Sequence, residues 1–451
     1  MGIAPVLPLV VTMSLPAMLS MSIQALYNVV DSIFVSRISK AALSATSIAY
    51  PLQMLMIAMN VGTAIGVNSL VARKLGEGRR DEANRAATSG LVLSFISYLV
   101  MMLIGVFGVR PFFEMTTSNP EIVEAGVIYA KIVLIISLPS FIQVCIEKTL
   151  QATGNMIMPM FSQLIGCVIN IIFDPILIFG IDAIGLRPMG ITGAAVATVF
   201  GQFCGMVFCM IIMIVKNHEV SISFKKYKLN RDIVKSIYAV SIPSIVMQAI
   251  GSVLITFLNM ILIVFSESAV NVMGIYFKLQ SFVYMPVFGL NQGVMPVMGY
   301  NFGAGKKKRV MDALKSGIFL AACIMAAGLI LFQTIPGVML GLFNADAETL
   351  AIGIPALRII SIAFIPSAFG IMFSTLFQAL GQGVQSLFMS LIRQLICILP
   401  AAYLLSKISI TAVWFAFPIA EGIALIMGFI LFSFCYKNVI SKLRPVEERM
   451  Q

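Results

Sequence analysis

Long apolar segments alternate with short polar loops along almost the whole of the 451-residue chain. A transmembrane helix needs about 20 consecutive apolar residues, because a helix rises about 1.5 Å per residue and the hydrocarbon core of a bilayer is about 30 Å thick. The pattern predicts twelve such helices, at residues 6–34, 43–70, 88–108, 122–150, 157–181, 192–215, 235–263, 270–298, 316–342, 349–378, 384–405 and 411–436. The first, fourth, eighth and tenth are longer than a bilayer requires, so we expect these helices to tilt, kink or protrude into water.

The second half of the chain repeats the first at an offset of 227 residues. Ser14-Leu-Pro16 matches Ser241-Ile-Pro243, and Gln151-Ala152 matches Gln378-Ala379. Several glycines recur at the same offset: Gly62, Gly66, Gly76, Gly78 and Gly90 fall on Gly289, Gly293, Gly303, Gly305 and Gly317. Because six predicted helices separate the two copies, both copies cross the membrane in the same direction.

The repeat and the spans together predict the fold class and the domains. We expect an all-α polytopic membrane protein, with twelve transmembrane helices in two parallel six-helix repeats, or lobes, around a central cavity. The predicted domains are an N-terminal lobe at 1–215, a basic cytoplasmic linker at 216–234, a C-terminal lobe at 235–436 and a cytoplasmic tail at 437–451. Two lobes of this kind are typical of alternating-access transporters, although two lobes packed as a rigid scaffold are an alternative.

The composition agrees with a membrane protein, since 59% of residues are apolar and only 11% are charged, against about 25% charged residues in soluble domains. Most of the 30 Lys and Arg residues lie in one set of loops, at 73–85, 216–235 and 306–315, and in the tail. The opposite set of loops holds only Arg37, Lys40, Arg110, Arg187 and Lys407. The positive-inside rule therefore predicts a multi-pass cell-membrane protein with both termini in the cytoplasm, and the net charge of +11 is a topology signal rather than a nucleic-acid footprint.

The residues that usually carry metal binding or catalysis are sparse. The seven cysteines all lie in apolar segments without metal-binding spacing, and the single histidine, His218, lies in the polar linker, which excludes a histidine-based metal or triad site. The segment GAGKKKR at 303–309 lacks the Ser or Thr that follows the lysine of a phosphate-binding loop. We therefore expect no ATP hydrolysis, no enzymatic activity and no cofactor.

The acidic residues inside predicted spans include Asp31, Glu147, Asp174 and Glu421. A charged side chain at the bilayer centre costs about 2.5–3.5 kcal/mol on insertion scales, so such residues are functional candidates. Asp174 and Asn170 are four residues apart and share one helix face. Pro175 follows directly and is expected to kink the helix, because its ring removes a backbone N–H. We expect Asp174 to bind an ion or substrate, with a satisfied structural acid as the alternative.

Asp31 ends a polar stripe in the first predicted helix, which also holds Gln24, Tyr27 and Asn28 at helical spacing. The repeat equivalents of Asp31 and Asp174 are apolar, which assigns the carboxylate site to the first lobe. Thr198 in GITGAAVAT adds a hydroxyl, or alternatively bonds back to a carbonyl of its own helix. The expected coupling site offers only oxygens or amides, suited to H+ or a hard cation such as Na+, and consists of Asp31, Asn170, Asp174 and Thr198.

The remaining charged groups inside spans leave several alternatives open. In the second lobe, Lys278 and Arg393 either pair with Glu421 or line the cavity, and we expect pairing. Glu147 lies next to a lysine near the cytoplasmic end of the fourth span, where snorkelling towards the membrane surface is the simpler interpretation. Lys131 is either a relay or a pairing partner.

Several segments together resemble the multidrug and toxic compound extrusion (MATE) family. They are SLPAML, NVVDSIFVSRI, NIIFDPILIFG, GITGAAVATV and PVMGYNFGAGKKKRV, and the chain is most similar to the DinF-like prokaryotic branch. The resemblance covers essentially the whole chain and implies export of organic cations and other amphipathic toxins, driven by inward H+ or Na+ flow. By motif, Asp31, Asn170, Asp174 and Thr198 match the ion pocket of the first lobe. The acids of the Na+-type pattern in helices seven and ten are missing here.

These observations predict an antiporter that acts as a monomer in the lipid bilayer on small amphipathic or cationic substrates, without a nucleic-acid partner. Gln24, Tyr27, Asn28, Lys278 and Arg393 are the expected cavity-lining residues, and Pro16 and Pro175 are the expected kink or gating positions. The main alternative is a flippase for a lipid-linked saccharide, which needs a cavity rich in Arg and Lys to hold a pyrophosphate. An intramembrane enzyme is a third class, but its catalytic clusters are absent from the sequence.

Overall fold

The computed structural model describes residues 1–180, 187–215, 219–225, 228–343 and 345–445, without the side chains of residues 27–33, 36 and 40. Every regular element in this part of the chain is a helix, which confirms the all-α class. The helices of the first half are α1 (Val6–Ser36), α2 (Lys40–Gly76), α3 (Arg80–Leu103), the π-helical turn η1 (Ile104–Gly108), α4 (Val109–Thr116), α5 (Pro120–Ile135), α6 (Leu138–Ala152), α7 (Ile157–Phe179) and α8 (Ile191–Val215).

The second half follows the same order. Its helices are α9 (Arg231–Leu262), α10 (Glu267–Gly303), α11 (Lys307–Thr334), α12 (Pro336–Gly341), α13 (Ala347–Ser361), α14 (Phe364–Ala379), α15 (Gly383–Leu391), the π-helical turn η3 (Ile392–Ile398), α16 (Leu399–Ser406), α17 (Ile410–Val413), α18 (Ala416–Asn438) and the 3₁₀ turn η4 (Ile440–Lys442). Each predicted span corresponds to one helix or to one run of consecutive helices. Helix α9 begins at Arg231, inside the segment 216–234 that was predicted as the linker.

Within the described residues, nine helices are long and apolar enough to cross a membrane, and eleven spans result if each of two bent helix pairs counts as one. The exception among the twelve predicted spans is α10. Its 37 residues exceed the length of a bilayer span, but polar side chains interrupt its apolar character, among them Lys278, Asn291 and Gln292. The multi-pass architecture is therefore present, and the eighth predicted span is the least apolar of the set.

Two of the long predicted spans are bent helix pairs. The fourth consists of α5 and α6, which meet at an angle of 44°, and the tenth consists of α13 and α14, which meet at 49°. Pro139 follows the first bend and Pro366 follows the second. Proline is tolerated in the first turn of a new helix, where its missing N–H has no intrahelical partner to lose, so each break lies where proline disturbs the backbone least. The kinks expected for these two spans are confirmed.

The internal repeat is visible in the backbone. The bounds of α10 are those of α2 shifted by 227 residues, and both helices have 37 residues. The loop glycines repeat as well: Gly78 and Gly305 have φ values of 77° and 72°, and Gly154 and Gly381 have 93° and 83°. A positive φ strongly favours glycine because other residues carry a Cβ that clashes there. The glycine coincidences in the sequence therefore mark equivalent turns.

The chain divides into two compact units. Unit 1 consists of Met1–Met18, Gly76–Gly78 and Val246–Gln451, and unit 2 consists of Leu19–Leu75 and Arg79–Ile245. Each unit thus contains mostly one repeat, together with the start of the first helix of the other repeat. The boundaries predicted from the sequence describe the repeat rather than these units, and they stay a prediction.

Equivalent hydrogen bonds fix these exchanged helix starts. In unit 1, the Ser14 hydroxyl of α1 donates to the Leu290 carbonyl of α10 over 3.2 Å. In unit 2, the Ser241 hydroxyl of α9 donates to the Thr63 carbonyl of α2 over 3.0 Å. Both bonds are buried, and an offset of 227 relates their donors and their acceptors. Ser14 and Ser241 therefore occupy equivalent positions for a structural reason, since each donates a hydrogen bond that holds the start of its helix against a helix of the other repeat.

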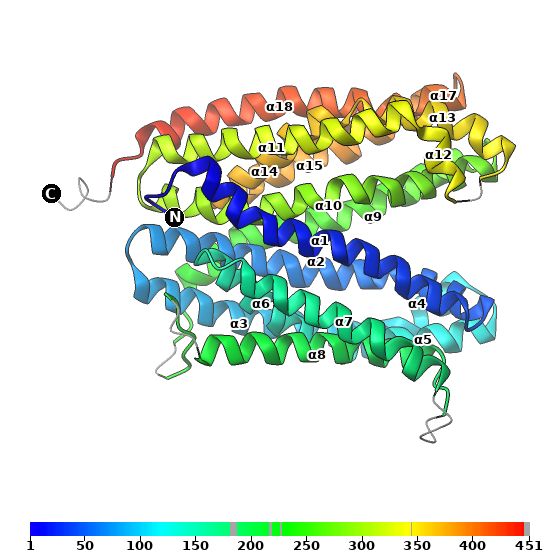
Figure 1. Ribbon diagram of the computed structural model, residues 1–451, viewed down its shortest axis with the longest axis horizontal. Coiled ribbons are helices and arrows are strands. Elements are labelled where there is room, and N and C mark those ends of the chain that lie inside the picture. The colour runs from blue at the N-terminus through cyan, green and yellow to red at the C-terminus, as the bar shows by residue number, and fades with distance from the viewer. Residues whose placement is uncertain (181–186, 216–218, 226–227, 344, 446–451) are drawn as a thin grey trace. The chain divides into compact units, whose positions relative to one another are not determined.

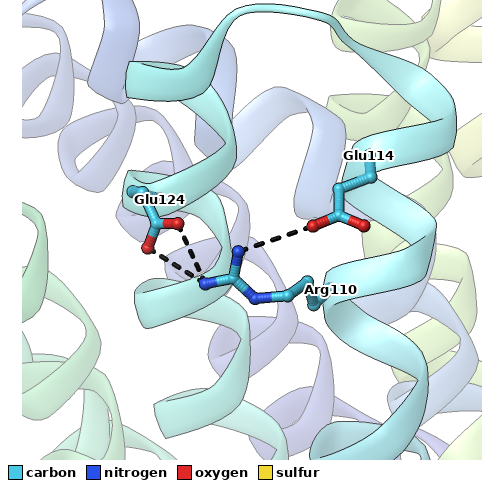
Figure 2. A network of polar contacts seen from close by, with 3 residues as sticks. All are labelled: Arg110, Glu114 and Glu124. Carbon is cyan, nitrogen blue, oxygen red and sulfur yellow. Dashed lines mark hydrogen bonds and ion pairs between the residues drawn. The ribbon is translucent and has the colours of Figure 1, made fainter.

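An exposed ion-pair network joins α4 to α5 (Figure 2). Arg110 donates to both carboxylate oxygens of Glu124, over 2.9 and 3.1 Å, and lies 3.5 Å from the carboxylate of Glu114 one turn away on its own helix. The three side chains are about half exposed, so water and salt screen the attraction between them.

We expect the Glu124→Gln variant to change the melting temperature of the purified protein by about 1 °C or less, because exposed ion pairs contribute little to stability. Thermal unfolding in detergent at low and high salt would measure this change. A fall of many degrees would contradict the prediction and would mean that the network holds the α4–α5 hairpin together.

Candidate functional site

The first part of the candidate site lies on α7. Asn170 and Asp174 occupy one face of this helix, and their side chains are 2% and 0% exposed. Pro175 lies inside α7, which stays α-helical as far as Phe179 and ends at Gly180, where φ is 76°. A carboxyl group and an amide are therefore held in the interior of unit 2, inside a helix that is long and apolar enough to cross a membrane.

The neighbouring helix α8 brings Thr198 to this face. The Asn170 side-chain amide donates to the Thr198 hydroxyl oxygen over 3.3 Å, and the Thr198 hydroxyl donates to the Ala194 carbonyl over 3.0 Å. The Thr198 proton thus goes back to its own helix, as one interpretation expected, while its oxygen contacts Asn170. The part of Thr198 in ion binding stays a prediction. The structure brings Asn170 and Thr198 together, with Asp174 one turn further along α7.

Glycine contacts allow α7 and α8 to lie this close, as Figure 1 shows for the two helices side by side in unit 2. A Cβ atom added to Gly193 would lie 2.5 Å from the Leu177 carbonyl oxygen, and one added to Gly201 would lie 2.6 Å from the Gly166 carbonyl oxygen. Small residues let membrane helices approach backbone to backbone. These contacts flank Thr198 along α8 and fix its distance from α7.

Part of the predicted site lies outside the described residues. The backbone of Asp31, Tyr27 and Asn28 belongs to α1, but their side chains are among those that are not described. Gln24, at the start of the same stripe, is exposed, and Pro16 lies inside α1. The contribution of Asp31 to the ion site and the role of Pro16 as a hinge therefore stay predictions.

In unit 1, the predicted cavity-lining cations contact different groups. Arg393, in the π-helical turn η3, lies 3.4 Å from the carboxylate of Glu421 on α18, so the pairing expected for Glu421 is present. Lys278 is exposed on α10, and its ammonium group lies 5.8 Å from the ring centre of Phe343. Lys278 also lines a cavity of about 540 Å³ together with Asn259 and Asn271. The structure shows an ion pair for one cation and an aromatic contact for the other.

Glu147 requires a correction, since the sequence suggested that it snorkels to the membrane surface. It lies on α6 and is only 2% exposed. Its carboxylate oxygens accept hydrogen bonds from two glutamine amides, Gln143 on the same helix at 3.0 Å and Gln163 on α7 at 2.9 Å. The snorkelling interpretation is wrong because these amides satisfy the carboxylate inside the protein. The Gln143–Glu147 spacing could have signalled a polar face, but the partner on α7 is not visible in sequence.

The oxygen donors of the site fit a proton or a hard cation rather than a transition metal. Among the described residues, no group of three or more His, Cys, Asp or Glu side chains could hold a metal ion. Asp174, Asn170 and Thr198 supply a carboxylate, an amide and a hydroxyl, the oxygen donors that hard cations prefer. A bound Na+ would therefore depend on these three side chains together with that of Asp31, which is not among the described side chains.

Comparison with known proteins gives one family. The MatE family model matches residues 16–176 and 243–404, one match in each repeat. The multidrug export protein MepA of Staphylococcus aureus strain MSSA476 is 26% identical over 440 residues, covering 95% of this chain and 94% of that protein. MepA of Staphylococcus haemolyticus strain JCSC1435 is 24% identical over 437 residues, covering 96% and 95%.

Solved structures agree with the sequence relatives. The outward-facing conformation of a multidrug resistance MATE family transporter of the MOP superfamily superposes with a TM-score of 0.91 at 26% identity. The match covers 98% of this chain and 97% of that one. Fold and sequence similarity thus extend over both repeats, including the segments that hold Asn170, Asp174 and Arg393.

Proposed function

We infer the activity of this chain from one premise: it belongs to the MatE family, whose model matches both of its repeats. It is a multi-pass membrane transporter for multidrug efflux, like the relatives that carry that name over nearly the full length of the chain. Its substrates are small molecules. The finer proposal concerns the driving ion, the kind of drug and the residues that couple one to the other.

The proposed reaction is antiport of lipophilic organic cations, or other amphipathic toxins, against inward H+ or Na+. One observation carries this proposal: the Asp174 carboxyl is fully buried in a helix that can cross a membrane, one turn from the Asn170–Thr198 contact. An ionised carboxylate inside a bilayer is unfavourable unless a cation or a proton compensates its charge. A drug cation and a coupling ion can each do so, and they exclude one another.

Competition for the same carboxylates, combined with alternating access of the site to the two sides of the membrane, then gives antiport. Facing the cytoplasm, ionised Asp174 and Asp31 attract a lipophilic cation, and facing outward they exchange it for H+ or Na+. Gln24, Tyr27 and Asn28 line the path, and bending of α1 at Pro16 releases the drug. We further propose that the protein acts as a monomer in the cell membrane with both termini in the cytoplasm, and that it uses no resident cofactor and catalyses no chemical step.

Transport into inverted membrane vesicles tests this proposal. A fluorescent lipophilic cation such as ethidium is added outside, and either a pH gradient or a Na+ gradient is imposed alone. The buried oxygen donors suit both ions, so each gradient is tested by itself. We expect dye accumulation with one of the two gradients, and vesicles without the protein give the background. Accumulation with pH only would assign a proton switch to Asp174, and accumulation with Na+ only would assign a cation site.

Failure to accumulate with either gradient would overturn antiport and favour the lipid-linked saccharide flippase, which labelled lipid-linked sugars would then test. The geometry weighs against that alternative. A flippase needs several free cations to hold a pyrophosphate, whereas Arg393 is engaged with Glu421 and leaves Lys278 as the remaining candidate.

A further inference from the structure

We propose that Glu147 is a second proton-binding site of this transporter, distinct from Asp174 and placed at the cytoplasmic half of the interface between α6, α7 and α8. This inference rests on the proposed antiport and applies to its H+ form. It concerns a buried carboxyl group that neither the resemblance to MATE transporters nor the sequence pattern assigned to the coupling site.

The Glu147 carboxyl lies at the centre of a buried polar cluster that joins three helices. Gln143 on α6 donates to one carboxylate oxygen, and Gln163 on α7 donates to the other. The Gln143 amide also contacts the Ser162 hydroxyl of α7 over 3.0 Å, and that hydroxyl donates to the Gly205 carbonyl of α8 over 3.2 Å. A change in the charge of Glu147 therefore acts on the contacts among all three helices.

The cluster can satisfy both protonation states of the carboxyl group. The structure places one amide nitrogen at each carboxylate oxygen, which is the arrangement that satisfies the ionised state. Within the described part of the chain, the buried Gln163 amide oxygen has no hydrogen-bond partner. When Glu147 is protonated, rotation of this amide by about 180° presents that oxygen to the new O–H, because an amide carries a donor and an acceptor of similar shape. A carboxylate that only ties helices together would not need this second arrangement.

The charged groups among the described residues around Glu147 do not form an ion pair with its carboxylate, so a bound proton is the group that neutralises its charge directly. Lys148 acts on the carboxylate through space, but its ammonium group donates to the Gln151 amide oxygen over 2.9 Å. The other titratable neighbours are two thiols, Cys167 on α7 and Cys209 on α8. Helices α2 and α3, which also contact α6, add no charged neighbour among the described residues. Amides stabilise a carboxylate by hydrogen bonds but carry no charge to neutralise it.

The position of the cluster relative to Asp174 gives it a place in the transport cycle. Gln163, Asn170 and Asp174 lie seven and four residues apart on α7, so they share one face of the helix. The rise from Gln163 to Asn170 is about 10 Å, and the Gly166–Gly201 contact lies between them. The positive-inside rule places the Gln163 end of α7 towards the cytoplasm. Inward-moving protons thus meet Asp174 first and Glu147 second, and Glu147 is the group that releases them.

Glu147→Gln and Glu124→Gln form a matched pair of variants. Each removes one glutamate charge, but Glu124 lies in the exposed ion pair with Arg110 and has no proposed part in transport. The amide in Glu147→Gln imitates the protonated acid, because its new N–H₂ group can donate to the partnerless Gln163 oxygen. We therefore expect this variant to insert and melt like the parent protein, which separates a proton role from a structural one.

Infrared difference spectroscopy of the full protein in lipid, labelled with ¹³C-glutamate, reads the proton directly. Stepping the pH across the neutral range should produce a protonated-glutamate carbonyl band that is present in the parent and in Glu124→Gln and absent from Glu147→Gln. The same variant should lower H+-driven dye accumulation in inverted vesicles by at least about tenfold. Absence of a Glu147-dependent band overturns the proposal, as does dye accumulation that only Na+ drives, although the latter leaves the exporter intact. A parent protein that accumulates no dye refutes the proposed function itself.

Discussion

The Asp174→Asn variant should lose ion-coupled export while the folded protein remains in the membrane. The substitution keeps the shape of the side chain and the neighbouring Asn170–Thr198 contact, but it removes the charge for which drug and coupling ion compete. We expect the initial rate of dye accumulation in inverted vesicles to fall by at least about a hundredfold, which corresponds to roughly 2.7 kcal/mol. Membrane insertion and the melting temperature should change little, because a neutral amide is less costly to bury than an ionised acid.

Asp346→Asn is the matched control for this experiment. Asp346 precedes α13 and its carboxylate accepts a hydrogen bond from the Thr349 backbone N–H over 2.8 Å, as an N-cap residue does. Asparagine caps a helix about as well as aspartate, so this variant loses one carboxylate without losing the cap. It should transport like the parent. Normal efflux by Asp174→Asn, or equal loss in both variants, would refute the assignment of Asp174 as the coupling residue.

The architecture could be predicted from the sequence because the signals that define it are periodic and long. Apolar segments of membrane-spanning length gave the helices, and the 227-residue offset gave equivalent elements, down to the positive φ values of Gly78 and Gly305. The bends were accessible only in part. Excess length predicted tilt, kinks or protrusion for four spans, and two of these are bent pairs, whereas α1 and α10 remain single helices although each contains proline. The weakest prediction was α10, whose polar side chains reduce the apolar signal.

Contacts between distant segments were not accessible in the same way. An offset relates equivalent positions but does not say which elements touch, so the exchange of the starts of α1 and α9 between the two units could not be inferred from it. The same limit explains Glu147. Its position near the end of a predicted span suggested contact with water. In the structure Gln163, which is 16 residues away in sequence, donates a hydrogen bond to the Glu147 carboxylate inside the protein. Asp174 was found because it is a carboxylate inside an apolar span and shares a helix face with Asn170, which are both local signals.

The Gly201→Ala variant should destabilise the protein and disturb the candidate site at the same time. The added Cβ would lie 2.6 Å from the Gly166 carbonyl oxygen and 3.3 Å from the Asn170 Cβ. A backbone atom cannot rotate away as a side chain can, so α7 and α8 must separate. Overpacking of this kind typically costs about 1–3 kcal/mol. Because the Asn170–Thr198 hydrogen bond already spans 3.3 Å, we expect the separation to break it and to slow dye export.

Gly422→Ala provides the same substitution without the contact. Gly422 lies in the interior of α18, and an added Cβ there meets no atom of another described segment within 4 Å. Alanine favours a helix over glycine by about 0.5–1 kcal/mol, so this variant should melt slightly higher than the parent and export normally. The two variants should therefore change the melting temperature in opposite directions. If Gly201→Ala melts lower but exports at the parental rate, the close approach of α7 and α8 serves the fold alone, and the Asn170–Thr198 contact has no part in coupling.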